Sequence, residues 1–432
     1  MIWNESKECM SRDELQALQS KRLVKTVNRV YHNVEYYRKR MQKEGIEPGD
    51  IRGIEDLSKL PYTTKDDLRE TYPFGLFAAP QSEIVRIHAS SGTTGKATVV
   101  GYTRKDIDIW AECVARALTQ AGVTREDTVQ VAYGYGLFTG GLGAHYGAEY
   151  LGARVVPQST GNTKKLVTMM KDFGVTAIAC TPSYLLHIAE LLEEMGEIGN
   201  IKLKAAICGA EPWTDNMRRQ MEEKLHINAF DIYGLSEVMG PGVACDCQYH
   251  KGLHVYEDHF LPEIISPETL LPVGENETGE LVFTTLTKEG LPLIRYRTKD
   301  LTSIHYDKCE CGRTLARISR FTGRTDDMLI IRGVNVFPSQ IESALLEMAG
   351  TTPHYLMIVD RVGNLDTLEV QVEVEERFFS DEIKELESLT KKISHVLQNA
   401  IGLAVKVKLV EPRTIERSMG KAVHVIDNRK LV

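Results

Sequence analysis

The stretch TAIACTPSYLLHIAELLEEMG, residues 176–196, places a short apolar run directly before a segment whose apolar residues recur at helical spacing. Four similar strand-like runs are separated by helical segments: TVQVAYG (128–134), ARVVP (153–157), AAICG (205–209) and AFDIYG (229–234). This alternation predicts a mostly parallel α/β sheet. Because ligands bind beyond the carboxyl ends of strands in such sheets, the residues that follow these runs are candidates for a site.

The pattern differs on either side of this region. The first 80 residues indicate helices and connections, and GELVFTTL (279–286) and LPLIRYRT (291–298) indicate a small β subdomain. Strand and helix patterns after the segment GRTDD predict a compact α+β unit of about a hundred residues, which is enough for a domain. We therefore expect an α/β fold with a large N-terminal domain (1–325), which includes the β subdomain, and a small α+β C-terminal domain (326–432).

The composition is that of a soluble globular protein. The 432 residues are 42% hydrophobic and 26% charged, and the formal net charge is -8. This acidic balance disfavours a nucleic-acid partner. Residues 128–148 are uncharged but contain six glycines, which disfavours a membrane span. The N-terminal residues lack the apolar core of a secretory signal, so we expect a cytoplasmic protein.

The loop in HASSGTTGKATVVGYT, residues 88–103, is rich in serine, threonine and glycine. A Walker phosphate loop needs a different glycine spacing and a helix after it. Here two residues separate Gly92 from Gly95, and the segment after Lys96 reads as a strand. Six hydroxyl or amino side chains between Ser90 and Thr98 suit a clamp on triphosphate oxygens, but a surface turn explains the stretch equally well.

Four further motifs follow this loop in order: IYGLSE (232–237), YRTKD (296–300), GRTDD (323–327) and SMGK (418–421). Together with the loop they resemble the motifs of the adenylate-forming enzymes, the superfamily of acyl-CoA synthetases, luciferases and adenylation domains. The segments AYGYGLFTGGLGAHYGAE (132–149) and LIIRGVNVFPSQIE (329–342) are similar to the phenylacetate-CoA ligase group within it. The resemblance covers nearly the entire chain.

The resemblance implies a reaction in two steps. A carboxylate attacks the α-phosphorus of ATP and releases pyrophosphate, and the thiol of CoA then attacks the acyl-adenylate. Lys421 would stabilise the charge of the first transition state, and Glu237 would hold Mg²⁺ against the phosphates. Asp326 would be the hinge about which the C-terminal domain rotates, after which Gly333 and Val334 would face the CoA tunnel.

The resemblance also assigns the contacts of the nucleotide. Ser236 would hydrogen-bond the α-phosphate, Asp300 would accept from both ribose hydroxyls, and Arg324 would bridge ribose or phosphate. The remaining ATP or AMP contacts would come from Ser90, Ser91, Gly92, Thr93, Thr94, Lys96, Gly209, Ala210, Glu211, Asp231, Ile232, Tyr233 and Gly234. Tyr133, Tyr135 and Phe138 are interleaved with glycines, including Gly136; they either wall a flat slot or fill the core of a turn, and the resemblance favours an aryl-acid pocket.

Two Cys-x-Cys pairs need a separate explanation. CDCQYHKGLH (245–254) and CECGRT (309–314) together supply four thiols and two imidazoles, more than a tetrahedral zinc site needs. Disulfides are disfavoured in a reducing cytoplasm. We expect a structural Zn²⁺ that staples the β subdomain. The resemblance implies Cys247 and His254 as ligands, because they occupy positions expected in zinc-bearing relatives; Cys309 and Cys311 would complete the four, and Cys245 and His250 remain substitutes.

We therefore expect an ATP-dependent ligase that joins phenylacetate or a close aryl analogue to CoA, with ATP, Mg²⁺, CoA and structural Zn²⁺ as its cofactors. A second hypothesis is an adenylating enzyme that passes its acyl group to a carrier-protein thiol. A third is a nucleotide-binding regulatory protein without catalysis, which the joint presence of Lys421, Glu237 and Asp300 disfavours. A homodimer is the default expectation for a soluble enzyme.

Overall fold

The computed structural model describes residues 1–90, 97–325, 329–332, 334–346, 348, 351–362, 365–374, 383–416 and 424–429. They form two compact units. Unit 1 contains Met1–Cys180, Gly199–Ala210 and Ile227–Arg320, and unit 2 contains Thr181–Ile198, Glu211–His226 and the described residues from Phe321 onward. The boundary that we expect between residues 325 and 326 stays a prediction, because residue 326 is outside the described residues.

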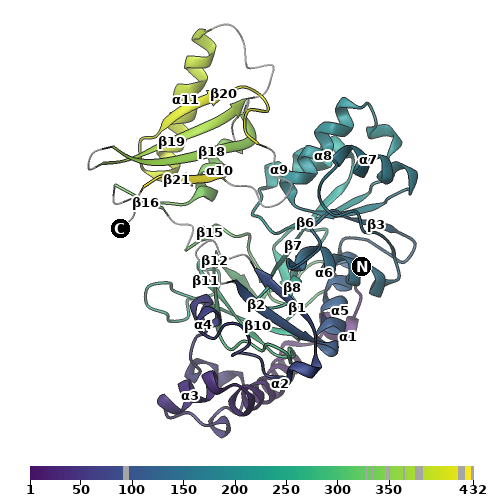
Figure 1. Cartoon of the computed structure of the whole chain (residues 1–432), viewed down its shortest axis with the longest axis vertical. Helices are drawn as coiled ribbons and strands as arrows, with labels where there is room; N and C mark the ends of the chain where they lie inside the picture. The colour runs from purple at the N-terminus through teal and green to yellow at the C-terminus, as the bar shows by residue number, and fades with distance from the viewer. Residues whose placement is uncertain are drawn as a thin grey trace. The chain divides into compact units, whose positions relative to one another are not determined.

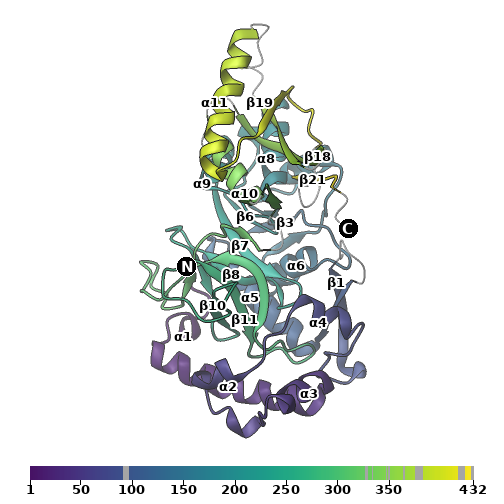
Figure 2. The same ribbon diagram turned by 90° about the vertical axis from the view of Figure 1, so that its left-hand side faces the viewer.

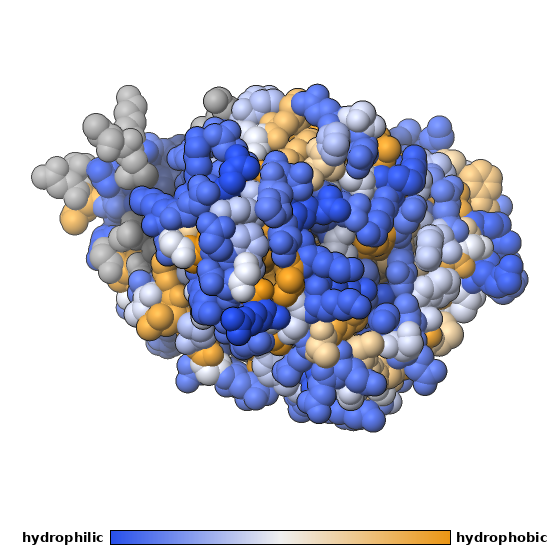
Figure 3. Space-filling model, turned by 90° about the horizontal axis from the view of Figure 1, so that it is seen from below, coloured by the Kyte–Doolittle hydropathy of each residue, from blue (hydrophilic) through white to orange (hydrophobic). Residues whose placement is uncertain are grey.

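Unit 1 begins with helices: α1 (Glu5–Glu8), α2 (Arg12–Asn33), α3 (Glu35–Lys43) and α4 (Lys65–Glu70), with 3₁₀ turns at Pro48–Asp50, Ile54–Lys59 and Gln81–Glu83. The Ser11 side chain and Glu14 close a capping box at the start of α2. An extended residue, Val34, separates α2 from α3. Helices α2 and α3 lie side by side at one end of unit 1 (Figures 1 and 2), and the face seen from there is mostly hydrophilic, with hydrophobic residues scattered among polar ones (Figure 3).

A nine-stranded sheet organises unit 1, in the order β13-β14-β9-β8-β7-β6-β5-β3-β4. Its parallel half contains β3 (Thr128–Val131), β4 (Arg154–Val156), β5 (Ala177–Cys180), β6 (Ala205–Gly209) and β7 (Asn228–Leu235), with helix α7 (Thr163–Asp172) between β4 and β5. Its antiparallel half contains β8 (Gly240–Asp246), β9 (Leu253–Val255), β13 (Ile304–His305) and β14 (Arg317–Ile318). The predicted parallel α/β sheet is confirmed.

Two helices pack closely together beside this sheet: α5 (Arg104–Gln120), which begins at a capping box formed by Thr103 and Asp106, and α6 (Thr139–Leu151). A Cβ atom at Gly143 would lie 2.6 Å from Cζ2 of Trp110, and one at Gly147 would lie 2.3 Å from Cβ of Val114. The glycine-rich uncharged run is therefore a strand, a loop and a helix whose glycines permit close helix packing. Within the described residues, no helix combines the length and apolar character that crossing a membrane requires.

Two smaller sheets complete unit 1. Strands β1 (Ile84–Ser90) and β2 (Thr98–Thr103) form an antiparallel pair, and β10 (Phe260–Ile265), β11 (Gly279–Thr285) and β12 (Tyr296–Thr302) form the predicted β subdomain. The expectation that the cysteine pairs staple the β subdomain was wrong. The turn that contains Cys309 and Cys311 lies between β13 and β14, at the edge of the nine-stranded sheet, because β14 pairs with β9 and β13.

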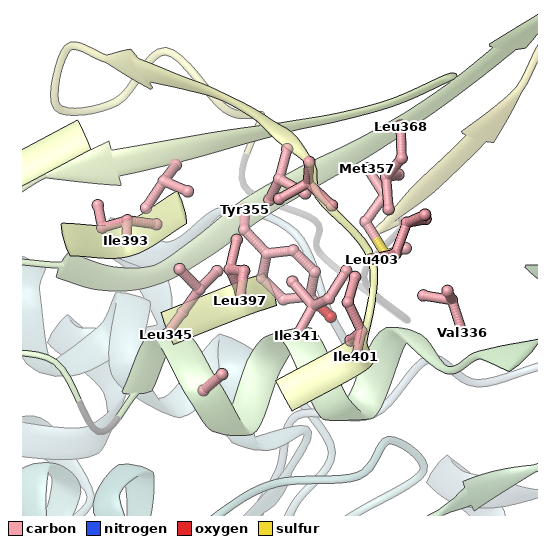
Figure 4. Close-up of a cluster of buried hydrophobic side chains, with 14 of the residues drawn as sticks. Val336, Ile341, Leu345, Tyr355, Met357, Leu368, Ile393, Leu397, Ile401 and Leu403 are labelled. Carbon is pink, nitrogen blue, oxygen red and sulfur yellow. The ribbon is translucent and has the colours of Figure 1, made fainter. Parts of the chain in front are cut away.

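Unit 2 contains α8 (Pro182–Glu194), α9 (Asp215–Leu225), β15 (Gly323–Arg324), β16 (Leu329–Ile331), β17 (Val334–Val336), α10 (Pro338–Leu346), β18 (Thr351–Val362), β19 (Leu365–Val374), α11 (Ile383–Ile401), β20 (Lys406–Val410) and β21 (Val425–Asp427). A 3₁₀ turn follows α8 at Ile198–Asn200. The sheet order is β20-β19-β18-β21. Buried side chains of α10 and α11, such as Leu345 and Leu397, surround Tyr355 of β18 (Figure 4). The small α+β C-terminal fold is confirmed, whereas its rotation stays a prediction.

Candidate active site

The end of β7 and strand β12 bring two of the sequence motifs into contact. The Tyr233 hydroxyl donates a hydrogen bond of 2.6 Å to Oδ2 of Asp300. Asp300 is buried, and its backbone N–H donates to the Thr298 hydroxyl. An aromatic residue and a carboxylate of the predicted nucleotide set are therefore fixed against each other by a hydrogen bond.

The turn after β7 carries the other predicted polar groups of its motif. The carboxylate of Glu237 is buried, and its Oε1 lies 3.5 Å from Oγ of Ser90 and 3.6 Å from Nζ of Lys65. The Ser236 hydroxyl lies 3.0 Å from the Thr139 hydroxyl at the start of α6. The turn thus presents a carboxylate and a hydroxyl beside the end of β1, where the Ser/Thr-rich loop begins.

Backbone geometry explains several small residues of the motifs. A Cβ at Gly209 would lie 2.1 Å from the Ile232 carbonyl oxygen, and one at Gly234 would lie 1.8 Å from the Gly240 carbonyl oxygen. These glycines permit β7 to approach β6 and β8. Ala210 has a φ of 74°, a left-handed conformation that turns the chain sharply after β6.

The remaining described members of the predicted nucleotide set have other partners. The Asp231 backbone N–H donates to the Asp246 carboxylate at 2.9 Å, and Ile232 is buried. Glu211 accepts a hydrogen bond of 2.7 Å from the Ser183 backbone N–H, near the start of α8. The structure therefore gives Glu211 a role in anchoring the segment after β6, which the sequence does not predict.

The predicted acyl-pocket residues share the loop between β3 and α6 but differ in exposure. Tyr133 is buried, Tyr135 is half-buried, and Gly136 and Phe138 are exposed, the latter by 46%. The Tyr135 hydroxyl lies 3.2 Å from Nδ1 of His145. The assignment of these side chains to one pocket wall stays a prediction.

His88 links this loop to β1 and was not predicted as a site residue. Its Nδ1 lies 3.0 Å from the Leu137 carbonyl oxygen, and its ring packs edge-on against Trp110 and Tyr102. Burial lowers the pKa of His88, which favours a neutral ring that donates through Nδ1.

Several predicted residues lie outside the described residues: Ser91, Gly92, Thr93, Thr94 and Lys96 of the loop, Asp326 of the hinge, Gly333 and Lys421. Arg324 lies in β15 and Val334 in β17, and both are half-buried in unit 2. The functions of these residues stay predictions.

The four predicted metal ligands come together at the edge of the nine-stranded sheet. One ligand atom from each of Cys247, His254, Cys309 and Cys311 lies within 4.8 Å of the others. The sulfurs of Cys247 and Cys309 are 3.8 Å apart, and the Cys311 sulfur is 3.5 Å from Nε2 of His254. Ligands of a tetrahedral zinc ion lie about 3.8 Å apart for two sulfurs and about 3.5 Å apart for sulfur and nitrogen. The donor set therefore fits Zn²⁺.

The two substitute ligands face other groups. The Cys245 sulfur lies 4.0 Å from the Ala117 carbonyl oxygen of α5, and Nδ1 of His250 lies 2.9 Å from the Asp246 carboxylate. Arg313 borders the cluster: its Nη1 donates to the Cys311 sulfur at 3.5 Å, and its Nε donates to the buried Glu8 carboxylate at 2.6 Å. The cluster is thus tied to the N-terminal segment.

Comparison with known proteins places this site in a family. Residues 13–286 match the family described as AMP-binding enzyme, and residues 333–429 match the AMP-binding enzyme C-terminal domain. The chain belongs to the AMP-binding enzymes. The motif resemblance is confirmed, because this AMP-binding enzyme is 50% identical to the phenylacetate-coenzyme A ligase of Escherichia coli over 98% of this chain and 97% of the relative.

Two further relatives support the same placement of this AMP-binding enzyme. The phenylacetate-coenzyme A ligase of Thermus thermophilus is 48% identical over the full length of both chains. The crystal structure of 2-hydroxyisobutyryl-CoA ligase in the postadenylation state, in complex with 2-HIB-AMP, superposes with a TM-score of 0.92 at 30% identity over 98% of this chain and 92% of that chain.

The sequence analysis did not predict the residues whose side chains contact the turn that carries Ser236 and Glu237. Tyr102, Thr139 and Lys288 contact the turn that carries Ser236 and Glu237, and Lys65 approaches the Glu237 carboxylate. Nothing in their local sequence indicates these roles. Lys288, for example, stands beside Glu289 in TLTKEG, a pattern typical of an exposed turn.

Proposed function

We propose that this protein is an ATP-dependent, AMP-forming ligase that joins phenylacetate or a close aryl analogue to CoA through an acyl-adenylate. The observation that carries the proposal is the identity of about one half, over nearly the whole chain, to phenylacetate-coenzyme A ligases. The contact between Tyr233 and Asp300, next to the turn with Ser236 and Glu237, supports it, because ligands of open α/β sheets bind beyond the carboxyl ends of strands, and β7 ends at this point.

The chemistry proceeds in two displacements. A carboxylate oxygen of the acid attacks the α-phosphorus, and the bond to the β-phosphate oxygen breaks to release pyrophosphate. The CoA sulfur then attacks the acyl carbonyl carbon, and AMP leaves with the electron pair of the broken C–O bond. We assign Ser236 to an α-phosphate oxygen, Asp300 to the ribose hydroxyls and Lys421 to the charge that develops in the first step.

Glu237 is the residue that would hold Mg²⁺. Its carboxylate is buried, and its contacts of 3.5 Å and 3.6 Å to Ser90 and Lys65 are long, which leaves oxygen lone pairs for a hard cation. Bound Mg²⁺ would neutralise phosphate charge. Ser90 and the five loop residues after it, which we assign to the departing phosphates, begin beside this carboxylate.

A pyrophosphate-release screen over aryl and aliphatic acids, with and without CoA, tests the proposed function. We expect release with phenylacetate and formation of phenylacetyl-CoA when CoA is present. Release without any acyl-CoA product until a carrier protein is added would instead support the transfer to a carrier thiol. The absence of pyrophosphate release with every acid would favour a regulatory nucleotide-binding protein.

We also propose that Cys247, His254, Cys309 and Cys311 hold a structural Zn²⁺. The distances between their ligand atoms match a tetrahedral ion, and a site with four protein ligands leaves no open position for a substrate. Metal analysis of the purified protein should find about one zinc per chain, and less than about one-tenth would contradict the proposal.

The cellular setting and assembly are proposals of the same kind. We place the protein in the cytoplasm because its proposed substrates ATP and CoA are found there, and we expect a homodimer, the commonest assembly of soluble enzymes. Light scattering on the purified protein measures the assembly directly.

A further inference from the structure

The turn at residues 236–239 has four consecutive backbone carbonyls that are held by two buried side chains. The Tyr102 hydroxyl lies 3.2 Å from the carbonyl oxygen of Ser236 and 3.0 Å from that of Met239. Nζ of Lys288 donates to the carbonyl oxygens of Glu237 at 3.1 Å and Val238 at 2.9 Å. Within the described part of the chain, these two side chains supply hydrogen bonds to the four carbonyls, while the backbone N–H groups of Val238 and Met239 close the turn onto the Leu235 carbonyl oxygen. The two side chains therefore tie the turn to neighbouring elements.

The two side chains also contact each other. Nζ of Lys288 lies 4.5 Å from the centroid of the Tyr102 ring, within the range of a cation–π interaction. Trp110 stacks on Tyr102 with the ring centroids 5.1 Å apart, and its Nε1 donates to the Pro241 carbonyl oxygen at 2.9 Å, just beyond the turn. Side chains of Tyr102, Lys288 and Trp110 therefore contact the backbone of the turn from residue 236 to residue 241.

Hydrogen bonds to the backbone of the two residues after Lys288 hold this segment in place. The buried carboxylate of Asp106 accepts hydrogen bonds from the backbone N–H groups of Glu289 at 2.7 Å and Gly290 at 2.8 Å, directly after Lys288. The same carboxylate accepts from the Thr103 N–H at the start of α5. A helix cap thus fixes the segment that delivers the ammonium group.

Burial of the Lys288 ammonium group costs the folded chain free energy, because the charged form is removed from water. Lys288 is 2% exposed, and burial lowers its pKa to about 7, although Asp106 and Glu237 favour the charged form. A neutral hydrogen-bond donor would hold the same carbonyls without the desolvation penalty of a buried ammonium group. The buried ammonium group contacts the backbone carbonyls of Glu237 and Val238, directly after Ser236, so its position favours a role in the site over a role in packing alone.

We propose that Lys288 and Tyr102 are positioning residues of the nucleotide site, which fix the turn so that the Ser236 hydroxyl and the Glu237 carboxylate meet the metal-bound phosphates. The two residues act through backbone carbonyls and do not touch the substrate. The proposal rests on the proposed function of the site. Lys288 and Tyr102 differ in this respect from Lys65, whose ammonium group approaches the Glu237 carboxylate itself and whose side chain is 35% exposed.

Lys288→Met and Tyr102→Phe test the proposal by removing the ammonium group or the hydroxyl alone. We expect the KM for MgATP to rise by about tenfold or more in Lys288→Met and by a smaller factor in Tyr102→Phe, while the KM for the acid stays within about twofold. The conversion of a supplied acyl-adenylate to the thioester should change less than the KM for MgATP, because the adenylate keeps the α-phosphate but lacks the β- and γ-phosphates that Mg²⁺ would bind. Lys105→Met is the matched control, because Lys105 pairs with the neighbouring Glu289 but is exposed.

The measurements separate positioning from stability. A lower melting temperature with unchanged kinetic constants per folded molecule would overturn the proposal, and so would an unchanged KM for MgATP in both variants. If Lys288→Met does not fold, Tyr102→Phe decides by the same criterion, since it retains the ring and the lysine. If the wild-type protein releases no pyrophosphate with any acid, the proposed function fails, and calorimetric MgATP affinity decides the inference: weaker binding by the variants supports it, and equal binding overturns it.

Discussion

The turn after β7 and the cysteine cluster stand near the ends of neighbouring strands in one sheet, yet they are held in different ways. In the turn, the carbonyls of residues 236–239 accept hydrogen bonds from Tyr102 and Lys288. In the cluster, three sulfurs and one imidazole converge on a common point within 4.8 Å of one another. The first arrangement is complete with groups of the chain itself, whereas the second is arranged as the ligand shell of an ion.

This difference predicts which region depends on a metal. A buried polar group costs free energy unless it has a partner. The carbonyls of the turn have partners from β2 and from the segment after β11, and a metal adds nothing to them. At the cluster, the sulfurs of Cys247, Cys309 and Cys311 and Nε2 of the buried His254 face one another, and a metal ion is the group that all four can bind at once. Loss of zinc should therefore disturb the edge of the sheet and spare the turn.

The largest effect is expected from Cys309→Ser. The variant removes one of four ligands, so zinc should fall below about one-tenth equivalent and the melting temperature should fall by more than about 10 °C. Pyrophosphate release per folded molecule should stay within about threefold of the wild-type value, because the turn is held independently of the cluster. Metal analysis, thermal unfolding and the pyrophosphate assay measure the three quantities.

Cys245→Ser is the matched control for this variant. Cys245 is also buried but faces the Ala117 carbonyl oxygen of α5, so its replacement should leave the zinc content unchanged. Equal zinc loss in both variants would contradict the assigned ligand set. Loss of pyrophosphate release in step with zinc would show that the two regions are coupled.

The next effect is expected from Glu8→Ala, which changes the support of the cluster and leaves its ligands intact. Glu8 and Arg313 form a fully buried ion pair at 2.6 Å, and the Arg313 guanidinium also reaches the Cys311 sulfur. Breaking a buried pair from one side costs about 3 to 5 kcal/mol. For a unit of this size that is a fall of about 5 to 10 °C in melting temperature. Zinc content should stay close to that of the wild type.

Asp13→Asn is the control for Glu8→Ala, since Asp13 is an exposed acid on the next helix. Its effect should be within about 0.5 kcal/mol. If Glu8→Ala leaves the melting temperature unchanged, the ion pair does not hold the N-terminal segment against the cluster.

These two regions also differ in how far the sequence predicts them. Strand and helix patterns predict the parallel half of the sheet, and residue types at suitable spacing, together with the family resemblance, predict the cluster of Cys247, His254, Cys309 and Cys311 that the structure brings together. The edge that carries the ligands was misplaced, because β9 and β14 are only three and two residues long and show no pattern. Tyr233 and Asp300 could be predicted as nucleotide contacts because each lies in a recognisable motif, and the structure places them in contact with each other.

The support of the turn could not be predicted in the same way. Tyr102 and Lys288 lie 134 and 51 residues from the carbonyls that they contact, and their roles arise only when β2 and the segment after β11 fold beside β7. A buried lysine has no local signature, since the same letters next to a glutamate are typical of an exposed turn. Local motifs thus identify groups that are predicted to meet a ligand, but they do not identify the buried side chains that contact those groups.

The smallest effect is expected from Thr139→Val, which removes one hydroxyl from the turn region. The Thr139 hydroxyl is buried and lies 3.0 Å from the Ser236 hydroxyl, so the valine leaves that hydroxyl with one partner fewer. One such hydrogen bond contributes about 1 kcal/mol. If the bond orients Ser236 toward the α-phosphate, the rate of adenylation should fall by about fivefold. The melting temperature should change by less than about 3 °C.

Thr119→Val in α5 separates the loss of a hydroxyl from the loss of this particular hydrogen bond. The Thr119 hydroxyl is also buried but has no hydrogen-bond partner among the described residues, so its removal should be neutral or slightly stabilising and should leave adenylation unchanged. A slower reaction in Thr139→Val alone would show that the Ser236 hydroxyl is oriented from α6. Equal rates in both variants would mean that the carbonyl contacts of Tyr102 and Lys288 orient the turn without help from α6, because those contacts are untouched in either variant.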